Sequence, residues 1–213
     1  MPPIDLTLVL DCAYDDLMTD KDLHSLALQI NRSYSVQRVA KCAAAGGLVL
    51  TSYGDRLDAQ MQRVCPHADR WQRFRREQAS YTTLFPREKL VYLSADAEDV
   101  LETLEPDTVY VIGALVDRNH HKNLTHQRAT ELGIRTAQLP IRSFVATSHR
   151  RVLTVNHVVE ILTHWCGHRD WQQAFLNAIP QRKLTAPQPA STAVGEETTE
   201  EQQHDNDDEG SSI

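Results

Sequence analysis

The sequence predicts an α/β fold, a mostly parallel sheet with helices on both faces. Two patterns lead to this prediction. Short runs rich in Val, Leu and Ile recur along the chain, as is typical of strands buried on both faces of a parallel sheet. Longer stretches with one apolar side separate these runs, and strands that alternate with helices favour a parallel sheet. The length of 213 residues suits one domain of ordinary size with a tail.

Five segments are expected to be strands, and five helices are expected around them. The strands are predicted at residues 6–10, 48–53, 89–93, 109–116 and 135–139. The helices are predicted at residues 21–45, 97–104, 124–132, 154–165 and 170–178. Glycine supplies two of the stops, because Gly46 follows the first helix and Gly133 follows the third. Asp96 is placed to cap the second helix.

A polar segment, residues 56–76, carries six arginines with Trp71 and Phe74 between them. Arginines interleaved with aromatic residues can contact RNA. A run of charge is more often a solvated face. The sequence leaves both interpretations open.

The stretch from 109 to 122, VYVIGALVDRNHHK, is the one around which the chain is organised. Its apolar strand breaks into a polar loop at Asp117. Open α/β sheets place their ligand crevices at the carboxyl ends of the strands, which makes Asp117 a candidate for chemistry. Aspartate after a strand is also a common turn former and helix cap. The local pattern alone does not separate these two roles.

The net charge of −7 comes from the carboxyl-terminal tail. Residues 184–213 hold eight acidic residues and no Lys or Arg, which leaves 21 acids against 22 Lys and Arg in residues 1–183. A tail rich in Thr, Gln and Pro and poor in aromatics cannot bury enough apolar surface to offset its chain entropy. The chain is therefore expected to divide into a near-neutral domain, residues 1–183, and an acidic disordered tail, residues 184–213.

The cysteines and the amino terminus point to a reducing compartment and no membrane. The four cysteines are scattered without a CxxC pair, so neither a zinc ribbon nor a disulfide framework is indicated. No run approaches the roughly 20 apolar residues of a membrane span, and the first residues lack the pattern of a signal peptide. A cytoplasmic or nuclear location is expected.

No metal site is expected. Two groups of possible ligands occur, namely His120, His121 and His126, and then His164, Cys166 and His168. Neither supplies four ligands at a recognised spacing, so surface histidines are the favoured interpretation.

Three ordered motifs carry a resemblance to a known family. They are VIGALVDRN, GIRTAQLPI and VLTVNHVVEIL, at residues 111–119, 133–141 and 152–162. The chain resembles the SPOUT RNA methyltransferases, specifically the branch that methylates N1 of the purine at tRNA position 9. That family has a glycine-containing strand ending in Val-Asp-x-Asn, then GIxTxxLPI, then VLTxNxVxEIL. The likeness extends over about residues 1–183.

The resemblance implies a SPOUT fold with a carboxyl-terminal deep trefoil knot, one of the few exceptions to unknotted topology. The knot loops would hold S-adenosylmethionine in a bent pose, with S-adenosylhomocysteine as the product. The implied cofactor-binding residues are Leu93, Gly113, Ala114, Arg118, Asn119, Lys122, Leu139, Leu153, Thr154, Val155 and Val158. Glycine in a strand marks a close approach, which fits Gly113. The family usually has a second glycine where this chain has Ala114.

The resemblance also assigns the catalytic residues. Guanine N1 carries a proton at neutral pH, so methyl transfer to N1 requires a base, and a carboxylate within hydrogen-bond reach is a suitable one. By resemblance, Asp117 is that general base. Gln29 matches a family position near the target base. A solvent-facing glutamine on a helix is the alternative for Gln29.

The implied substrate is tRNA, whose target nucleotide must leave its stack to enter the pocket. Basic residues along the first helix and around the presumed pocket are expected to contact the RNA backbone. They are Arg32, Arg38, Lys41, Arg118, Lys122, Arg150 and Arg151, with Arg142 beside them. Whether guanine, adenine or both are accepted is left open.

The chain departs from the family pattern because it starts directly at the catalytic domain, without the basic amino-terminal extension that grips tRNA. Either it is a trimmed core or it relies on a protein partner for RNA affinity. By resemblance it would act as a monomer. Two rival classes are a catalytically silent SPOUT RNA-binding subunit of a tRNA-processing complex and an unrelated α/β nucleotide-binding enzyme. Asp117, Asn119 and Thr154 disfavour the first, and the missing GxGxxG disfavours the second.

Overall fold

The computed structural model describes residue 4 and residues 6–40, 46–117, 120–121, 123–144 and 153–179. The predicted tail, residues 184–213, and residues 118–119, 122 and 145–152 lie outside this part of the chain. Within the described ranges no helix is long and apolar enough to cross a bilayer.

The sheet has six strands that are all parallel to their neighbours, which confirms the predicted α/β class. Its order is β3-β2-β1-β5-β4-β6. The strands are β1 (Leu6–Asp11), β2 (Leu48–Thr51), β3 (Phe74–Arg76), β4 (Leu90–Leu93), β5 (Thr108–Gly113) and β6 (Arg135–Ala137). Five of them fall where the apolar runs predict a strand. The edge strand β3 was missed because only three residues pair and two of them are arginines.

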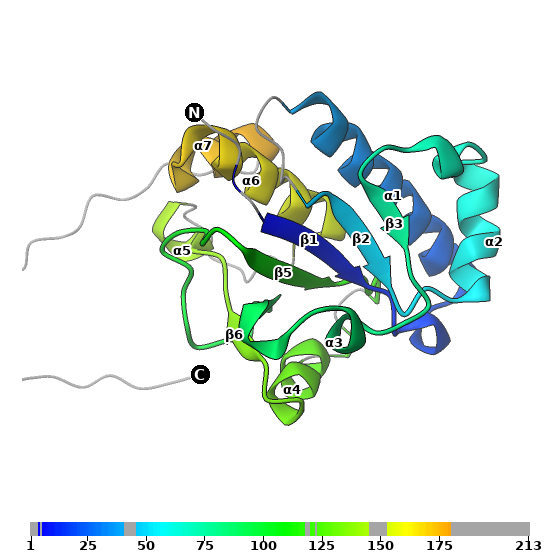
Figure 1. Ribbon diagram of the computed structural model, residues 1–213, viewed down its shortest axis with the longest axis horizontal. Coiled ribbons are helices and arrows are strands. Elements are labelled where there is room, and N and C mark those ends of the chain that lie inside the picture. The colour runs from blue at the N-terminus through cyan, green and yellow to red at the C-terminus, as the bar shows by residue number, and fades with distance from the viewer. Residues whose placement is uncertain are drawn as a thin grey trace, which may run out of the picture.

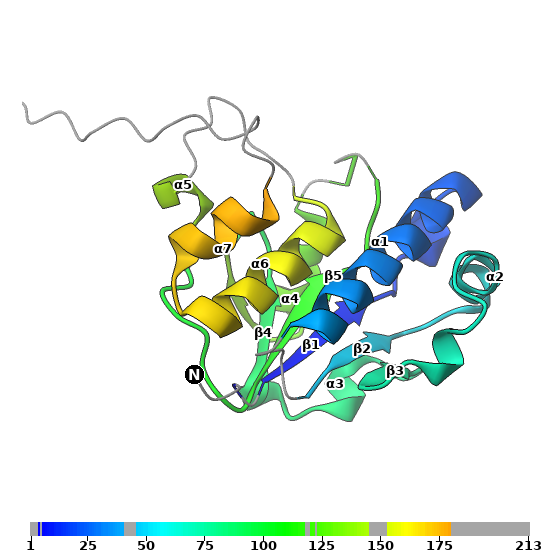
Figure 2. The ribbon, with the colours of Figure 1, turned by 90° about the horizontal axis from the view of Figure 1, so that it is seen from above.

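Helices cover both faces of the sheet (Figure 1). On one face, α7 (Trp171–Ala178), α6 (Val155–His168) and α1 (Asp20–Val39) lie in a row, and α2 (Asp55–Val64) continues it beyond α1 (Figure 2). The short α3 (Tyr81–Leu84) and α4 (Leu124–Glu131) lie on the opposite face. The four-residue α5 (Ile141–Phe144) contacts α7.

The alternation of side chains along the strands fills two separate cores. Leu8 and Leu10 of β1 join the larger core under α1, α6 and α7, where Ile30 and Leu162 are fully buried. Val9, one position away, joins the smaller core under α3 and α4. Because both faces are covered, neither face of the strand needs polar residues, and this explains the continuous apolar runs in the sequence.

Local signals at the helix ends agree with the structure. Thr19 and Asp22 form a capping box at the start of α1, and Asp170 accepts a hydrogen bond from the Gln173 amide at the start of α7. Gly133 follows α4 with a φ of 65°, the left-handed conformation that glycine adopts at low cost. Helix α1 ends at Val39 rather than at residue 45, and residues 41–45 lie outside the described part of the chain.

The predicted helix at residues 97–104 is wrong. This segment is irregular and forms a β-bridge between Val100 and Gln138. The backbone of Gln138 bonds to Asp99 and Leu101, and its side-chain amide donates to the carbonyl of Ala97 at 2.6 Å. These bonds to a distant segment take the place of an internal helical ladder, while Leu101 is buried.

The arginine-rich segment, residues 56–76, is partly structural. Arg56 donates to the carbonyl oxygens of Asp15 and Met18 and pairs with Asp20 at 3.0 Å, so it holds the loop before α1. Trp71 stacks on Tyr34 of α1 with ring centroids 4.0 Å apart. Contacts within the protein therefore explain the presence of Arg56 and Trp71 in this segment without an RNA contact.

Candidate active site

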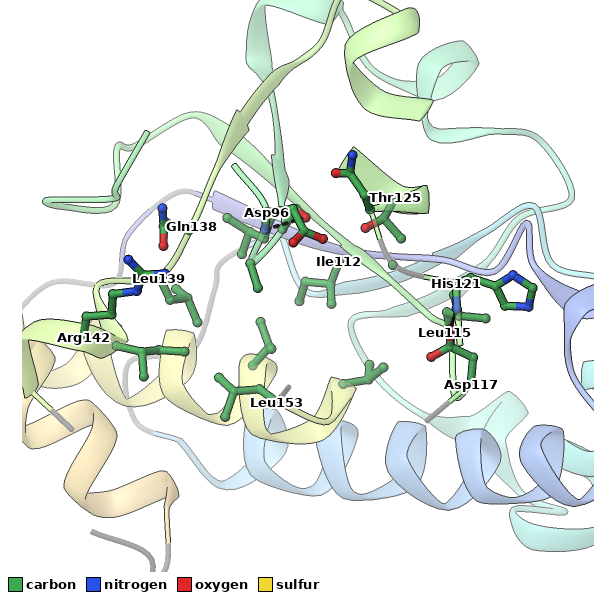
Figure 3. Close-up of a pocket in the computed structure, with 18 residues that line it drawn as sticks. Asp96, Ile112, Leu115, Asp117, His121, Thr125, Gln138, Leu139, Arg142 and Leu153 are labelled. Carbon is green, nitrogen blue, oxygen red and sulfur yellow. Dashed lines mark hydrogen bonds between the residues drawn. The ribbon is translucent and has the colours of Figure 1, made fainter. Parts of the chain in front are cut away.

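A cavity of about 240 Å³ opens at the carboxyl ends of β4, β5 and β6. The ends of these strands form its floor, and α4 and the start of α6 form its sides. Figure 3 shows its long shape: Asp117 and His121 lie at one end, and Gln138, Leu139 and Arg142 lie at the other. The position agrees with the rule that parallel sheets bind ligands beyond the carboxyl ends of their strands.

Six of the eleven predicted cofactor-binding residues line this cavity. They are Leu93, Gly113, Leu139, Leu153, Val155 and Val158, which come from five different elements or loops. Three others, Arg118, Asn119 and Lys122, lie outside the described residues. The sheet brings Leu93 and Gly113 together because β4 and β5 are neighbours that end at the same level.

Ala114 and Thr154 are not among the lining residues. The Ala114 side chain is fully buried, and its amide donates to the Asp11 carbonyl at 2.9 Å, so its methyl group does not narrow the cavity. Thr154 is the residue before α6, and its hydroxyl bonds to the side chains of Asn156 and His157. In this structure both residues shape the backbone around the cavity without lining it.

Sequence reasoning missed several polar residues of the cavity. Asp96, Thr125 and Gln138 all line it. Asp96 follows β4 in the same way that Asp117 follows β5, and this position was the signal that could have found it. It was assigned instead as the cap of a helix that does not form. Nothing local in the sequence distinguishes Gln138.

Asp117 lies where two cavities meet. It lines the first cavity, and it also lines a second one of about 290 Å³ together with Leu17, Thr19, Lys21, Asp22, His120 and His121. The Asp117 carboxylate accepts a hydrogen bond of 2.7 Å from the His121 amide. The side chain is half-buried, so it is in reach of groups that enter from either cavity.

Gln29 does not face solvent, so that alternative is wrong. It is 7% exposed, and its side-chain oxygen accepts a 3.0 Å hydrogen bond from the Val155 amide at the start of α6. The first amides of a helix have no partner within the helix, so Gln29 satisfies one of them. Gln29 is not among the residues that line either cavity, and its contact with the target base stays a prediction.

We expect Gln29→Met to weaken cofactor binding as well as stability. Loss of the oxygen leaves the buried Val155 amide unpaired, at a cost of about 1–3 kcal/mol, and it frees a residue that lines the cavity. The matched control is Gln37→Met, because Gln37 is also buried on α1 and donates to Thr163 of α6 at 2.9 Å, away from the cavity. Melting temperature and ligand affinity, measured on both variants, separate the two effects. Equal affinity in the two variants would contradict the role given to Gln29.

A buried polar cluster supports the cavity floor. The carboxylate of Asp11 accepts a bond from Tyr92 at 3.2 Å, and the hydroxyl groups of Tyr92 and Tyr14 are 3.0 Å apart. Burial raises the pKa of Asp11, and the nearby Arg128 guanidinium opposes this rise. Burial and the Asp11 charge raise the pKa of Tyr14 to about 12. The tyrosines therefore stay neutral hydrogen-bond donors at physiological pH.

Gly113 is required by this cluster and by α4. A Cβ atom at this position would lie 2.7 Å from the Thr125 methyl group and 3.1 Å from the Tyr92 hydroxyl. The close approach inferred from the sequence is therefore first a contact between protein atoms. Gly113 and Thr125 both line the cavity, so a shift of Thr125 would change its lining.

Among the predicted RNA-binding residues, Arg32 and Arg38 are exposed on α1. Lys41, Arg118, Lys122, Arg150 and Arg151 lie outside the described residues. Arg142 lines the far end of the first cavity. In the described ranges no group of three or more His, Cys, Asp and Glu side chains is placed to hold a metal ion.

The comparison that decides the family is a match over nearly the whole domain. The model of the family tRNA (guanine(9)-N(1))-methyltransferase TRM10/TRM10A matches residues 2–184. The chain belongs to the TRM10/TRM10A family. This confirms the resemblance drawn from the three motifs.

Relatives of this TRM10 chain agree in sequence and in structure. It is 43% identical over 184 residues to the tRNA (guanine(9)-N1)-methyltransferase of Schizosaccharomyces pombe. It is 41% identical over 182 residues to human tRNA methyltransferase 10 homolog A. Each match covers 85% of this chain, but only 60% and 53% of the relatives. The chain thus spans a little more than half the length of these relatives.

The chain is also similar to a solved structure of the family. The crystal structure of full-length spTrm10 in complex with SAH superposes with a TM-score of 0.78 at 42% identity, over 84% of this chain and 97% of that chain. The parallel sheet described above is therefore the TRM10 fold of the SPOUT class. The trefoil knot itself stays a prediction, because part of the loop that would form it, residues 145–152, lies outside the described residues.

Proposed function

We propose that this chain transfers a methyl group from S-adenosylmethionine to N1 of guanine at position 9 of tRNA. The observation that carries the proposal is the place of Asp117 between two cavities. A transferase needs one site for the donor and one for the acceptor, with the base between them. The names of the relatives and the bound SAH of spTrm10 support the same activity.

The first cavity fits S-adenosylmethionine. Its walls are mainly apolar, with Leu93, Leu139 and Leu153 among them, and its polar groups are concentrated at its ends and around Asp96. This is the usual composition of a small-molecule site, in which a few polar groups fix the orientation. When bound there, the cofactor supplies an electrophilic methyl group. Gly113 lines the cavity without contributing a side chain.

Asp117 is proposed to take the N1 proton of guanine. Guanine has no free lone pair at N1 until that proton leaves, and a positioned carboxylate accelerates such a step by roughly 10²- to 10⁴-fold. The bond from the His121 amide holds the carboxylate at the junction of the cavities, so that no energy is spent on orienting it during the reaction.

The isolated chain is expected to bind S-adenosylmethionine or S-adenosylhomocysteine without RNA, because described residues of the chain itself line the first cavity. Titration calorimetry checks this. The absence of both heat and a thermal shift at millimolar ligand would contradict it.

Activity is tested with labelled S-adenosylmethionine and unmodified tRNA, followed by mapping of the modified nucleotide. We expect the label at N1 of guanine 9. Cofactor binding without methyl transfer would favour the other candidate, a silent RNA-binding subunit. Sedimentation of the chain with and without tRNA tests the further proposal that it acts on tRNA as a monomer.

A further inference from the structure

Among the described residues that line the second cavity there is one lysine, Lys21, and its position in the fold is electrostatically unfavourable. Lys21 lies in the first turn of α1, and a cation near a helix amino terminus opposes the helix dipole. The acids beside it have other bonds: Asp20 pairs with Arg56 at 3.0 Å, and Asp22 accepts from the amide and the hydroxyl of Thr19. Lys21 is exposed, and it lines the cavity opposite no other lysine or arginine among the described residues.

Asp117 and Lys21 place a proton acceptor and a cation in this cavity, whose lining also includes Asp22, His120 and His121. Guanine presents the matching pair on its Watson–Crick edge: an N1–H donor next to the O6 acceptor. Lysine is a common partner of guanine O6 in nucleic-acid recognition. Adenine presents the reverse pair, an unprotonated N1 acceptor next to an amino donor, so in the orientation that places N1 at Asp117 neither residue meets a matching group.

We propose that the second cavity receives the extruded purine and that Lys21 selects guanine by contacting O6. This rests on the function proposed above. The N1–H bond breaks and its proton passes to the Asp117 carboxylate. The N1 electron pair forms the bond to the methyl group, and the electron pair of the broken S–CH₃ bond stays on sulfur, which leaves a neutral thioether.

Lys21 stabilises the negative charge that these reaction steps create on the base. As N1 loses its proton, negative charge spreads onto O6, where the ammonium group of Lys21 stabilises it. With adenine no such charge forms, and the methylated base becomes a cation that Lys21 repels. Lys21 therefore favours guanine both in the bound state and during transfer.

The test is Lys21→Met on tRNAs that carry guanine, inosine or adenine at position 9, with saturating enzyme and single-turnover rates. Inosine keeps O6 and N1–H but lacks the 2-amino group. We expect guanine and inosine to slow by about tenfold, less than the roughly 10²- to 10³-fold cost of losing a buried oxyanion donor, because Lys21 is solvent-exposed. The rate of adenine methylation should not fall. Lys21→Arg, which keeps the cation, should retain most of the guanine rate.

Lys89→Met is the matched control, because Lys89 precedes β4 at the opposite end of the sheet and pairs with Asp107 at 2.7 Å. Equal slowing of all three purines, or an unchanged guanine rate, would overturn the role of Lys21. If the unaltered chain does not methylate adenine, the pH profile decides. The guanine defect should shrink as rising pH removes the N1 proton, and a constant defect would overturn the inference. Failure of the unaltered chain to methylate guanine 9 would instead reject the proposed function.

Discussion

Asp117→Asn should lower the single-turnover rate of guanine-9 methylation by about 10²- to 10⁴-fold at neutral pH, the usual contribution of a general base. The fold should survive, because the asparagine oxygen can still accept the bond from the His121 amide. The rate of the variant should rise steeply with pH as solvent takes over proton removal. Adenine, whose N1 lone pair is already free, should be affected much less.

Asp96→Asn is the comparison for Asp117→Asn. Asp96 is a carboxylate of the first cavity, but it does not line the second. Its loss should change cofactor affinity without the steep pH dependence. If both purines slow alike and bound cofactor weakens in Asp117→Asn, the residue orders the loop instead. An unchanged rate of guanine methylation in Asp117→Asn would contradict the general-base hypothesis.

Gly113→Ala should damage both the fold and the cofactor site. The added methyl group would lie 2.7 Å from Thr125, and overpacking of this kind costs about 1–3 kcal/mol. The melting temperature should fall by about 2–4 °C per kcal/mol for a domain of this size. Because Thr125 must move and lines the cavity, we expect S-adenosylhomocysteine affinity to fall at least about tenfold, which corresponds to about 1.4 kcal/mol.

Gly167→Ala is the matched control for Gly113→Ala. Gly167 lies in the last turn of α6, and a Cβ atom there meets nothing within 4 Å. Alanine within a helix is favoured over glycine by up to about 1 kcal/mol, so this variant should melt at least as high as the unaltered chain and bind cofactor normally. Calorimetry and thermal melting on the pair check both effects. Normal affinity in a folded Gly113→Ala protein would show that the contact with Thr125 does not set the cavity.

The family and the carboxylate at the centre of the site could be predicted from the sequence. The motifs around Asp117 are local strings, and their order along the chain identified the TRM10 family that the comparison confirms. The end of a buried strand is also a local signal, and it singled out Asp117, which lines the cavity together with Leu93 and Gly113, two residues that the resemblance implied.

The sequence by itself determined the elements whose signals are local. Apolar runs placed five strands, and caps such as Asp170 and stops such as Gly133 bounded the helices. Only the tertiary structure decided how distant segments bond. Gln138 draws residues 97–104 out of a helix, and Gln29 turns inward to the Val155 amide 126 residues away. A cavity is likewise formed by residues that are distant in the sequence. The residues next to Lys21 in the sequence therefore could not predict that it lines a cavity with Asp117, because burial and pairing depend on residues that the fold brings together.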